Sequence, residues 1–534
     1  MKKLYCCLTV VLLVAFLTVT AEAATLKIRV NGSGTTSPAV GNYSVGFGST
    51  TSILAIPSNG WKFSHWSGSM SGSLNPDSIK CYWGTYTVYA NFTQLPALSP
   101  DTALQHYMAK VDGNYAWNCY KTQTMFPYTN YFIDMTSHQW RNANEVDRPM
   151  WEHYLIIQAG WFGGSTCLFI IDGGDNDDDP PQQTEALLGW ASVLTGYPVA
   201  MMKQIPNQPL YFSDEQNVRR VEDDILAYSF DKYLDTADYT WNGHLPMTKA
   251  SVLGMDTVQR QLSNVSTFFV AGASKRGWTT WLVAATDDSR IKGFVPIVIP
   301  ILSVDEQMDQ HWESYGFYSI QVEPYYDFDL FCRIKSQAGD NWKEIEDPYE
   351  YFGESSVISN KPKLIINASG DEFFITDSLQ FYWDDIPGPG SKRVRIFPNC
   401  SHGFAEGEDL YYDALSTAIA WCGAVKDNDP IPSYSWTVGA NSITVNCGSS
   451  PDTVLLWQAT NSTARDFRVD TIGTSWTSTQ LYDQGNNTFV ASCPAPAQGW
   501  SAFMVEIDWG GGHKYTTEVI VRPDVLPYAG THCQ

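Results

Sequence analysis

Val270-Ala-Gly-Ala-Ser274-Lys-Arg-Gly-Trp278 separates two segments of different character. Residues 266–271 before it are apolar and β-prone over the length of one strand, and residues 279–286 after it have the composition of a buried helix. A serine in a sharp turn between a strand and a helix, with glycines nearby, has the architecture of a nucleophile elbow. Such a turn exposes the hydroxyl and directs the helix N-terminus at any negative charge that develops beside it.

The spacing departs from the usual G-x-S-x-G pattern. Arg276 occupies the place of the second glycine, and Gly277 follows one position later. Gly272 keeps its expected place, where a Cβ would press on the following helix. Since many Gly-x-Ser sequences are only turns, this stretch alone leaves an ordinary turn open as the alternative.

Two later segments support the elbow. The strand predicted at residues 363–370 is followed at once by Asp371, and the strand predicted at residues 393–397 is followed within a few residues by His402. Each residue therefore comes just after the end of a strand, in the chain order Ser, Asp, His that α/β-hydrolases use. An imidazole can accept the serine proton near neutral pH, and a carboxylate holds the imidazole in the required tautomer. We therefore predict a catalytic triad of Ser274, Asp371 and His402.

A second loop is a candidate oxyanion hole. Residues 166–171 read as a fully buried strand, and Asp172-Gly-Gly-Asp175 follows it. In α/β-hydrolases the corresponding loop provides one N–H group, and the residue after the nucleophile provides the other. We predict that Gly173 or Gly174 acts together with the Lys275 amide. An ordinary Gly-Gly turn is the alternative.

Charged segments around this loop have structural interpretations. The acidic run at residues 175–179 could hold calcium, but it lacks the EF-hand register, and a solvated loop is favoured. Residues 217–233 are predicted to form an amphipathic helix whose charged first turns make a structural salt-bridge face. There is no C-x-x-C pair, so no zinc site is predicted, and we expect neither a metal nor a cofactor.

The N-terminus indicates export. Two lysines and an apolar run over residues 8–19 precede Ala21-Glu-Ala23, which predicts a signal peptide at residues 1–23. An uncleaved anchor is the alternative, although the apolar run is short for a membrane span. We expect a secreted, extracellular protein, or a periplasmic or cell-surface one in a bacterium. The later sequence contains no segment predicted to span a membrane.

Composition limits the partners. The chain has 534 residues, and 33 Lys and Arg face 57 Asp and Glu, which gives a formal net charge of −24. A surface this acidic argues against nucleic acid and anionic membranes as partners. A small-molecule ester or a peptide is the expected substrate.

Nine cysteines remain after the signal peptide, so at least one is unpaired within the chain. We expect disulfides between Cys447 and Cys493 and between Cys400 and Cys422. Asn-x-Ser/Thr sequons would carry glycans only in a eukaryotic host. They occur, for example, at Asn31, Asn91, Asn264, Asn399 and Asn461, and one at Asn367 falls in a predicted core strand.

Three folded domains are predicted. Residues 24–94 form a small all-β module, residues 101–426 form an α/β, doubly wound sheet, and residues 433–523 form a β-sandwich with immunoglobulin-like strand spacing. Trp61 and Trp66 in the first module could stack on sugars, but packing in a small core is favoured. Contact with carbohydrate or a cell surface through the β modules stays open as a further role.

The interval between residues 302 and 351 is rich in aromatic side chains. In α/β-hydrolases a lid is commonly inserted at this point, and an aromatic lid would shape the pocket and exclude water. Plain helical packing is the alternative, and both interpretations can hold together.

Several motifs carry a family resemblance: Leu245-Pro-Met247, Gly272-Ala-Ser-Lys-Arg-Gly-Trp278, residues 365–374 and Pro398-Asn-Cys-Ser-His402. With these motifs, residues 101 to about 525 resemble the PhoPQ-activated pathogenicity-related protein family. The resemblance implies an α/β-hydrolase-like catalytic domain with Ser274, Asp371 and His402 as its triad, and Arg276 is a feature of the family. Residues 55–68 resemble a repeat module of bacterial surface and secreted proteins, which the basic family plan lacks.

Two functions follow from the resemblance. The first is a secreted serine hydrolase that cleaves an ester or amide bond. The second is a secreted signalling or binding protein, similar to proliferation repressors, whose hydrolase scaffold does not turn over substrate. A complete triad favours the first, because drift would usually lose one of its members.

Overall fold

The computed structural model describes residues 23–184, 186–388, 392–528, 530 and 533. The predicted signal peptide lies outside these residues apart from its last position. The chain folds as two compact units: the first ends at Ala97 and includes Ala109–Val111, and the second contains Leu98–Met108 and the chain from Asp112 onward.

The first unit is all β, because its short alternating segments each bury one face. Two sheets, ordered β3-β1-β7-β5 and β2-β4-β6, share one core. Their strands are β1 (Ala24–Asn31), β2 (Gly34–Ser37), β3 (Gly41–Val45), β4 (Ser49–Pro57), β5 (Trp61–Gly68), β6 (Asp77–Cys81) and β7 (Thr85–Gln94). Trp66 is only 1% exposed and its indole N–H donates to the Leu74 carbonyl, so it serves the core and offers no free face to a sugar.

A sheet in the order β16-β15-β14-β13-β11-β12-β10-β9-β8 forms the centre of the second unit. Its strands are β8 (Ala116–Met125), β9 (Tyr128–Gln139), β10 (Met150–Gly160), β11 (Thr166–Ile171), β12 (Val199–Met202), β13 (Thr267–Ala273), β14 (Ile291–Ile297), β15 (Lys363–Ala368) and β16 (Lys392–Phe397). The neighbouring strands β12, β11, β13, β14, β15 and β16 are parallel to one another. The strands β10, β9 and β8 add an antiparallel extension beside β12. The predicted α/β class is confirmed, although the hairpin β8–β9 was not foreseen.

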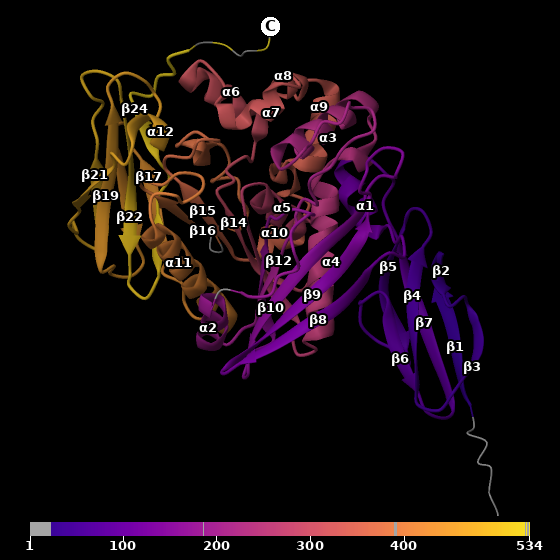
Figure 1. The fold of residues 1–534 in the computed structure, drawn as a ribbon. Helices are drawn as coiled ribbons and strands as arrows, with labels where there is room; N and C mark the ends of the chain where they lie inside the picture. Colours follow the sequence, from indigo (N-terminus) through magenta and orange to yellow (C-terminus); the bar gives the residue numbers. More distant parts are fainter. Residues whose placement is uncertain (1–22, 185, 389–391, 529, 531–532, 534) are drawn as a thin grey trace, which may run out of the picture. The chain divides into compact units, whose positions relative to one another are not determined.

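Helices cover both faces of this sheet, as its apolar strands require. Figure 1 shows α4 (His244–Gln261) and α5 (Lys275–Ala285) on one face and α2 (Ala186–Thr195) and α11 (Glu408–Asp427) on the other. The remaining helices are α1 (Ala103–Ala109), α3 (Asp223–Thr236), α6 (Val304–Tyr315), α7 (Glu323–Tyr326), α8 (Leu330–Arg333), α9 (Gln337–Glu346), α10 (Ser356–Asn360) and α12 (Val469–Ile472). Among the described residues, no helix has the length and apolar character needed to cross a membrane.

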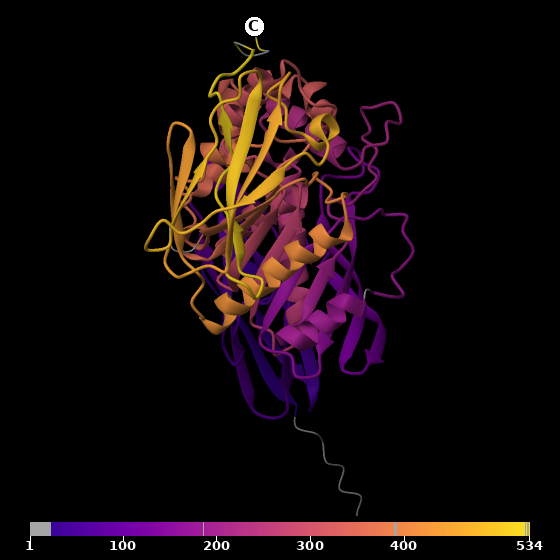
Figure 2. The ribbon, with the colours of Figure 1, turned by 90° about the vertical axis from the view of Figure 1, so that its left-hand side faces the viewer.

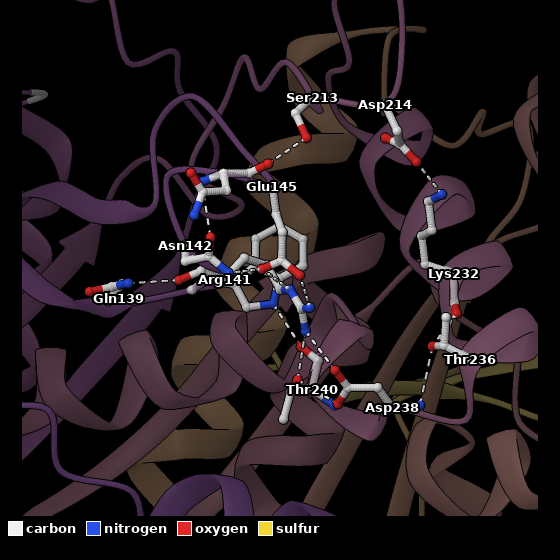
Figure 3. A network of polar contacts seen from close by, with 12 residues as sticks. Gln139, Arg141, Asn142, Glu145, Ser213, Asp214, Lys232, Thr236, Asp238 and Thr240 are labelled. Carbon is white, nitrogen blue, oxygen red and sulfur yellow. Dashed lines mark hydrogen bonds and ion pairs between the residues drawn. The ribbon is translucent and has the colours of Figure 1, made fainter.

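The helix predicted at residues 217–233 begins later, at Asp223. Glu222 has a φ of 50°, which ends the irregular segment before α3, and Arg220 pairs with Leu210 in an isolated bridge. The far end of α3 is anchored by the network in Figure 3. There, Arg141 forms ion pairs with Glu145 at 2.5 Å and with Asp238 at 3.0 Å. The network thus holds the segment that directly follows α3.

The C-terminal part of the second unit contains two antiparallel sheets, β17-β18-β21 and β20-β19-β22-β23 with β24 beside β22, whose apolar faces share one core. The strands are β17 (Tyr434–Val438), β18 (Ser442–Cys447), β19 (Thr453–Asn461), β20 (Thr477–Gln480), β21 (Thr488–Ser492), β22 (Trp500–Asp508), β23 (Lys514–Thr516) and β24 (Ile520–Arg522). Arg395 on β16, 2% exposed, reaches Glu506 on β22 at 2.5 Å. This buried pair joins the C-terminal sheets to the central one.

Both predicted disulfides are wrong, because all four cysteines are free. Ser442 pairs with Ser492 and Asn446 with Thr488, so Cys447 and Cys493 lie at opposite ends of one strand pair, roughly 20 Å apart at ~3.4 Å per residue. Cys422 lies about 21 Å along α11 from the helix end that follows the His402 loop, at ~1.5 Å per residue. The disulfide found instead joins Cys332 on α8 to Cys533 in the C-terminal tail.

Two sequons have no free amide. The Asn399 amide donates to the Trp476 carbonyl at 2.9 Å, and its oxygen accepts from the Trp476 N–H at 2.8 Å. Asn461 is 7% exposed and its amide donates to Asp466. Both side chains therefore make hydrogen bonds within the protein.

Candidate functional site

Ser274 lies between β13 and α5, at the carboxyl end of the sheet. Its φ of 57° and ψ of −132° are strained for a residue with a side chain, and its N–H donates to the Ile297 carbonyl at 2.8 Å. Two glycines make the turn feasible. A Cβ on Gly272 would lie 2.5 Å from the Arg276 carbonyl oxygen, and a Cβ on Gly277 would lie 2.7 Å from Ile299. The glycine displaced to position 277 therefore allows α5 to pack closely against the chain after β14.

Asp371 and His402 meet beside this turn, although 30 residues of sequence separate them. The His402 Nδ1 lies 2.8 Å from Asp371 Oδ2, and Asp371 is 3% exposed. Asp371 Oδ1 accepts from the Phe373 N–H at 2.8 Å, which fixes the carboxylate. The other imidazole nitrogen, Nε2, is buried and has no hydrogen-bond partner among the described residues. The geometry thus leaves Nε2 free to accept a proton.

The backbone and ring of His402 are also held in place. Its N–H donates to Glu372 Oε2 at 2.8 Å, and the Phe373 ring lies 4.3 Å from the imidazole, centre to centre. Burial raises the pKa of Glu372. Ser274 and His402 line the same cavity, but within the described part of the chain no hydrogen bond joins them.

Two carboxylates that the sequence analysis placed on a structural helix face lie next to the elbow. Lys275 Nζ is 2.7 Å from Glu222 and 3.0 Å from Asp223, and Arg276 is 2.6 Å from Glu222. Burial would raise the pKa of Glu222, but the charges of Lys275 and Arg276 outweigh it and lower the pKa to about 2. Lys275 and Arg276, directly after Ser274, indicated that acidic partners would lie nearby. The sequence did not identify Glu222 as that partner, because it lies about fifty residues earlier in the chain.

The glycines after β11 lie beside the elbow, because β11 and β13 are neighbours in the sheet. A Cβ on Gly173 would lie 2.7 Å from the Arg276 guanidinium, so this glycine makes room for the arginine that replaces the usual elbow glycine. The Gly173 carbonyl accepts from the Gln204 N–H at 3.0 Å. The assignment of Gly173, Gly174 and the Lys275 amide to an oxyanion hole stays a prediction.

The neighbouring acidic run forms ion pairs within the loop region. Asp175 pairs with Arg219 at 3.0 Å, and Asp177 pairs with Arg148 at 2.7 Å. Among the described residues, no group of three or more His, Cys, Asp or Glu side chains is arranged to hold a metal ion. These carboxylates of the run thus have arginine partners.

Ser274 lines two cavities. A narrow one of about 60 Å³ is apolar and lies under the aromatic segment, whose helices α6 to α9 provide Met308, Phe331 and Trp342. Residues of the aromatic interval thus lie in helices and line a cavity with Ser274, whereas the lid role stays a prediction. A wider cavity of about 440 Å³ extends from Ser274 and His402 between the sheet and α11.

The chain was compared with known proteins, and two parts of it match by sequence. A sequence model of the "Divergent InlB B-repeat domain" matches residues 24–96. "Autocrine proliferation repressor protein A" from Dictyostelium discoideum is 31% identical over 462 residues, which cover 80% of this chain and 92% of that protein.

Two solved structures are similar at low identity. Acetyl xylan esterase 1 from Thermoanaerobacterium sp. JW/SL YS485 is 13% identical, with a TM-score of 0.40 over 59% of this chain and 91% of its own. An S-formylglutathione hydrolase from Agrobacterium tumefaciens is 14% identical, with a TM-score of 0.35 over 57% of this chain and 98% of its own. At these scores the likeness bears on neither activity nor substrate. The sequence model that matches residues 104–468 is decisive, and the chain belongs to the PhoPQ-activated pathogenicity-related protein family.

Proposed function

We propose that this protein is an exported serine hydrolase that cleaves an ester or amide bond with Ser274, Asp371 and His402. The observation that carries the proposal is the 2.8 Å contact between Asp371 and the Nδ1 of His402, in a cavity that Ser274 also lines. The strained backbone of Ser274 adds support, because such strain is kept where it serves a function.

The proposed reaction has two steps. In acylation, the Ser274 hydroxyl oxygen attacks the substrate carbonyl carbon while His402 Nε2 takes its proton. The imidazolium then gives that proton to the leaving alcohol or amine. In deacylation, His402 takes a proton from water while the water oxygen attacks the acyl carbon. The imidazolium then returns that proton to the Ser274 oxygen as its bond to the acyl carbon breaks, and a carboxylic acid leaves. Asp371 stabilises the imidazolium in both steps.

The negative oxygen of each tetrahedral intermediate needs donors. The N-terminus of α5 begins at Lys275, so its amide and the helix dipole favour charge at this point. Gly173 or Gly174 would supply the second N–H. The ion pairs of Lys275 with Glu222 and Asp223 hold the side chain of the first residue of α5.

A second function is a secreted signal that needs no turnover. It is favoured by the name of the Dictyostelium relative and by the missing hydrogen bond between Ser274 and His402 in the described structure. In this case the β modules would provide the contacts with a cell surface or carbohydrate.

Labelling with a fluorophosphonate probe separates the two functions. Under the hydrolase proposal the wild-type chain labels, and Ser274→Ala and His402→Ala do not. Ser266→Ala is the matched control, since this serine lies exposed just before β13 and should leave labelling intact. Absence of labelling in the wild type, with biological activity retained in Ser274→Ala, would favour the signalling function.

A further inference from the structure

One face of the central sheet carries α2 and α11, with a cavity beside them. The sheet residues that line this cavity, among them Leu168, Ile170, Ala271, Ala273 and Ile297, form what we call the strip. On this face α2 packs against β9, β10 and β12, whereas α11 packs against β14 and β15. Figure 2 shows the two helices in front of the sheet in magenta and orange. The central strand β13 is partly covered by α11, since the rings of Phe269 and Trp421 lie 5.9 Å apart, centre to centre. Central strands of a parallel sheet are normally buried on both faces.

The strip is incompletely covered towards Ser274, whereas Leu168 and Ala271 further along it are buried. Ile170 on β11 and Ile297 on β14 are only half-buried, and Ala273 on β13 is exposed. All three line the cavity of about 440 Å³, which Leu188 of α2 and Ala414 of α11 close from the sides. Its volume lies in the range of about 300–1,000 Å³ that small-molecule sites occupy.

The strip has a definite length and a reactive end. Leu168, which also lines the cavity, pairs with Phe269 on β13, five residues before Ser274. At ~3.3 Å per residue the cavity runs for roughly 17 Å along the strands. One leaflet of acyl chains in a bilayer is about 15 Å thick, half of the ~30 Å hydrocarbon core. A single extended aliphatic chain therefore matches the strip in length and polarity.

The charged groups of the cavity gather at the reactive end and are already paired. Asp172 lies 2.7 Å from Lys203, and Arg276 lies 2.6 Å from Glu222. The rest of the lining is dominated by Leu, Ile, Val, Ala and Met side chains. The pocket under α6 to α9 is much smaller, at about 60 Å³.

From these observations we infer that the strip between α2 and α11 binds the long aliphatic chain of the substrate, so that the bond cleaved at Ser274 is that of a long-chain ester. The inference rests on the proposed hydrolase function and names its substrate class. The aliphatic chain belongs to either the acyl or the alcohol part of the ester, and the ester bond lies at the end of the strip next to Ser274.

Chain-length profiles test the inference. The full exported chain is assayed with p-nitrophenyl acetate, butyrate, octanoate and dodecanoate, and with the acetate esters of butanol, octanol and dodecanol. Each buried CH₂ contributes up to about fourfold, so kcat/KM should rise at least tenfold from the four-carbon to the eight-carbon member of one series. A flat profile or a preference for the shortest member in both series overturns the inference.

Ala414→Trp fills the strip from α11 and should lower the ratio of long-ester to acetate kcat/KM at least tenfold. Asp409→Trp adds the same indole to an exposed position of α11 and should leave that ratio at the wild-type value. A general folding defect would lower both esters together, so an unchanged ratio in Ala414→Trp refutes the assignment.

Binding without turnover separates this inference from the hydrolase proposal. Calorimetry should detect dodecanoate binding to Ser274→Ala, with a negative heat-capacity change from apolar burial, and binding should weaken at least tenfold when Ala414→Trp is added. Probe labelling of Ser274 without dodecanoate binding would retain the hydrolase and reject the strip. Dodecanoate binding without labelling would retain the strip as a lipid site and reject the hydrolase.

Discussion

Replacing Glu222 by Gln removes the carboxylate that pairs with both Lys275 and Arg276, directly after the proposed nucleophile. The pKa of Glu222 falls from 4.5 to about 2 in the folded chain, which corresponds to about 3 kcal/mol. Its side chain is 37% exposed, so solvent screening reduces the expected loss to roughly 1–2 kcal/mol. For a unit of this size, we expect Tm to fall by a few degrees at pH 7.

The pH dependence has a definite sign. A carboxyl group whose pKa is lower in the folded state stabilises the fold above its unfolded pKa and loses this effect as the pH falls through the folded value. For Glu222 the window runs from about 4.5 down to about 2. Calorimetry should therefore find the full Tm difference between wild type and Glu222→Gln at pH 5 to 7 and a smaller one at about pH 3.5. A difference that stays constant over this range would refute the linkage.

Catalysis gives an independent readout. Without Glu222, the Lys275 side chain keeps only Asp223, and a small displacement of the first turn of α5 would move the elbow. We expect fluorophosphonate labelling to slow by about 10- to 100-fold. Glu215→Gln is the matched control, because Glu215 pairs with Arg220 at 2.5 Å and makes no contact with the elbow. It should lower Tm without changing the labelling rate. Equal labelling rates in both variants would show that the cluster is not needed to align Ser274.

Three further outcomes are expected. Asp371→Asn should slow labelling and turnover by about 10³- to 10⁴-fold, because an amide favours the wrong tautomer of His402; a loss below tenfold would contradict the triad. Titration of the denatured, unreduced chain from residue 24 onward should give seven free thiols, and a count of five would reveal a further disulfide. Glu506→Ala should cost about 3–5 kcal/mol by leaving buried Arg395 poorly paired, whereas Arg395→Met with Glu506→Leu should recover most of the Tm, as measured by calorimetry.

The local sequence was sufficient to predict the site residues that directly follow the end of a strand. The strand predicted at residues 166–171 has the bounds of β11, and the strand predicted at residues 363–370 is β15, which ends two residues earlier, at Ala368. Parallel strands bring their carboxyl ends to one sheet edge, so the order Ser274, Asp371, His402 predicted their meeting. The start of α3 at Asp223 was not predicted from the sequence. The positive φ of Glu222 depends on contacts of this residue with residues far along the chain.

Tertiary packing alone decided the contacts that no periodicity encodes. The pairing of Glu222 with Lys275, the disulfide between Cys332 and Cys533, and the separation of Cys447 from Cys493 all depend on which surfaces meet and in which register. The cavity beside α2 and α11 likewise cannot be predicted from the sequence, since it depends on where these helices pack on the sheet. A strand's own residues specify that it is buried, but the neighbouring helices determine how completely.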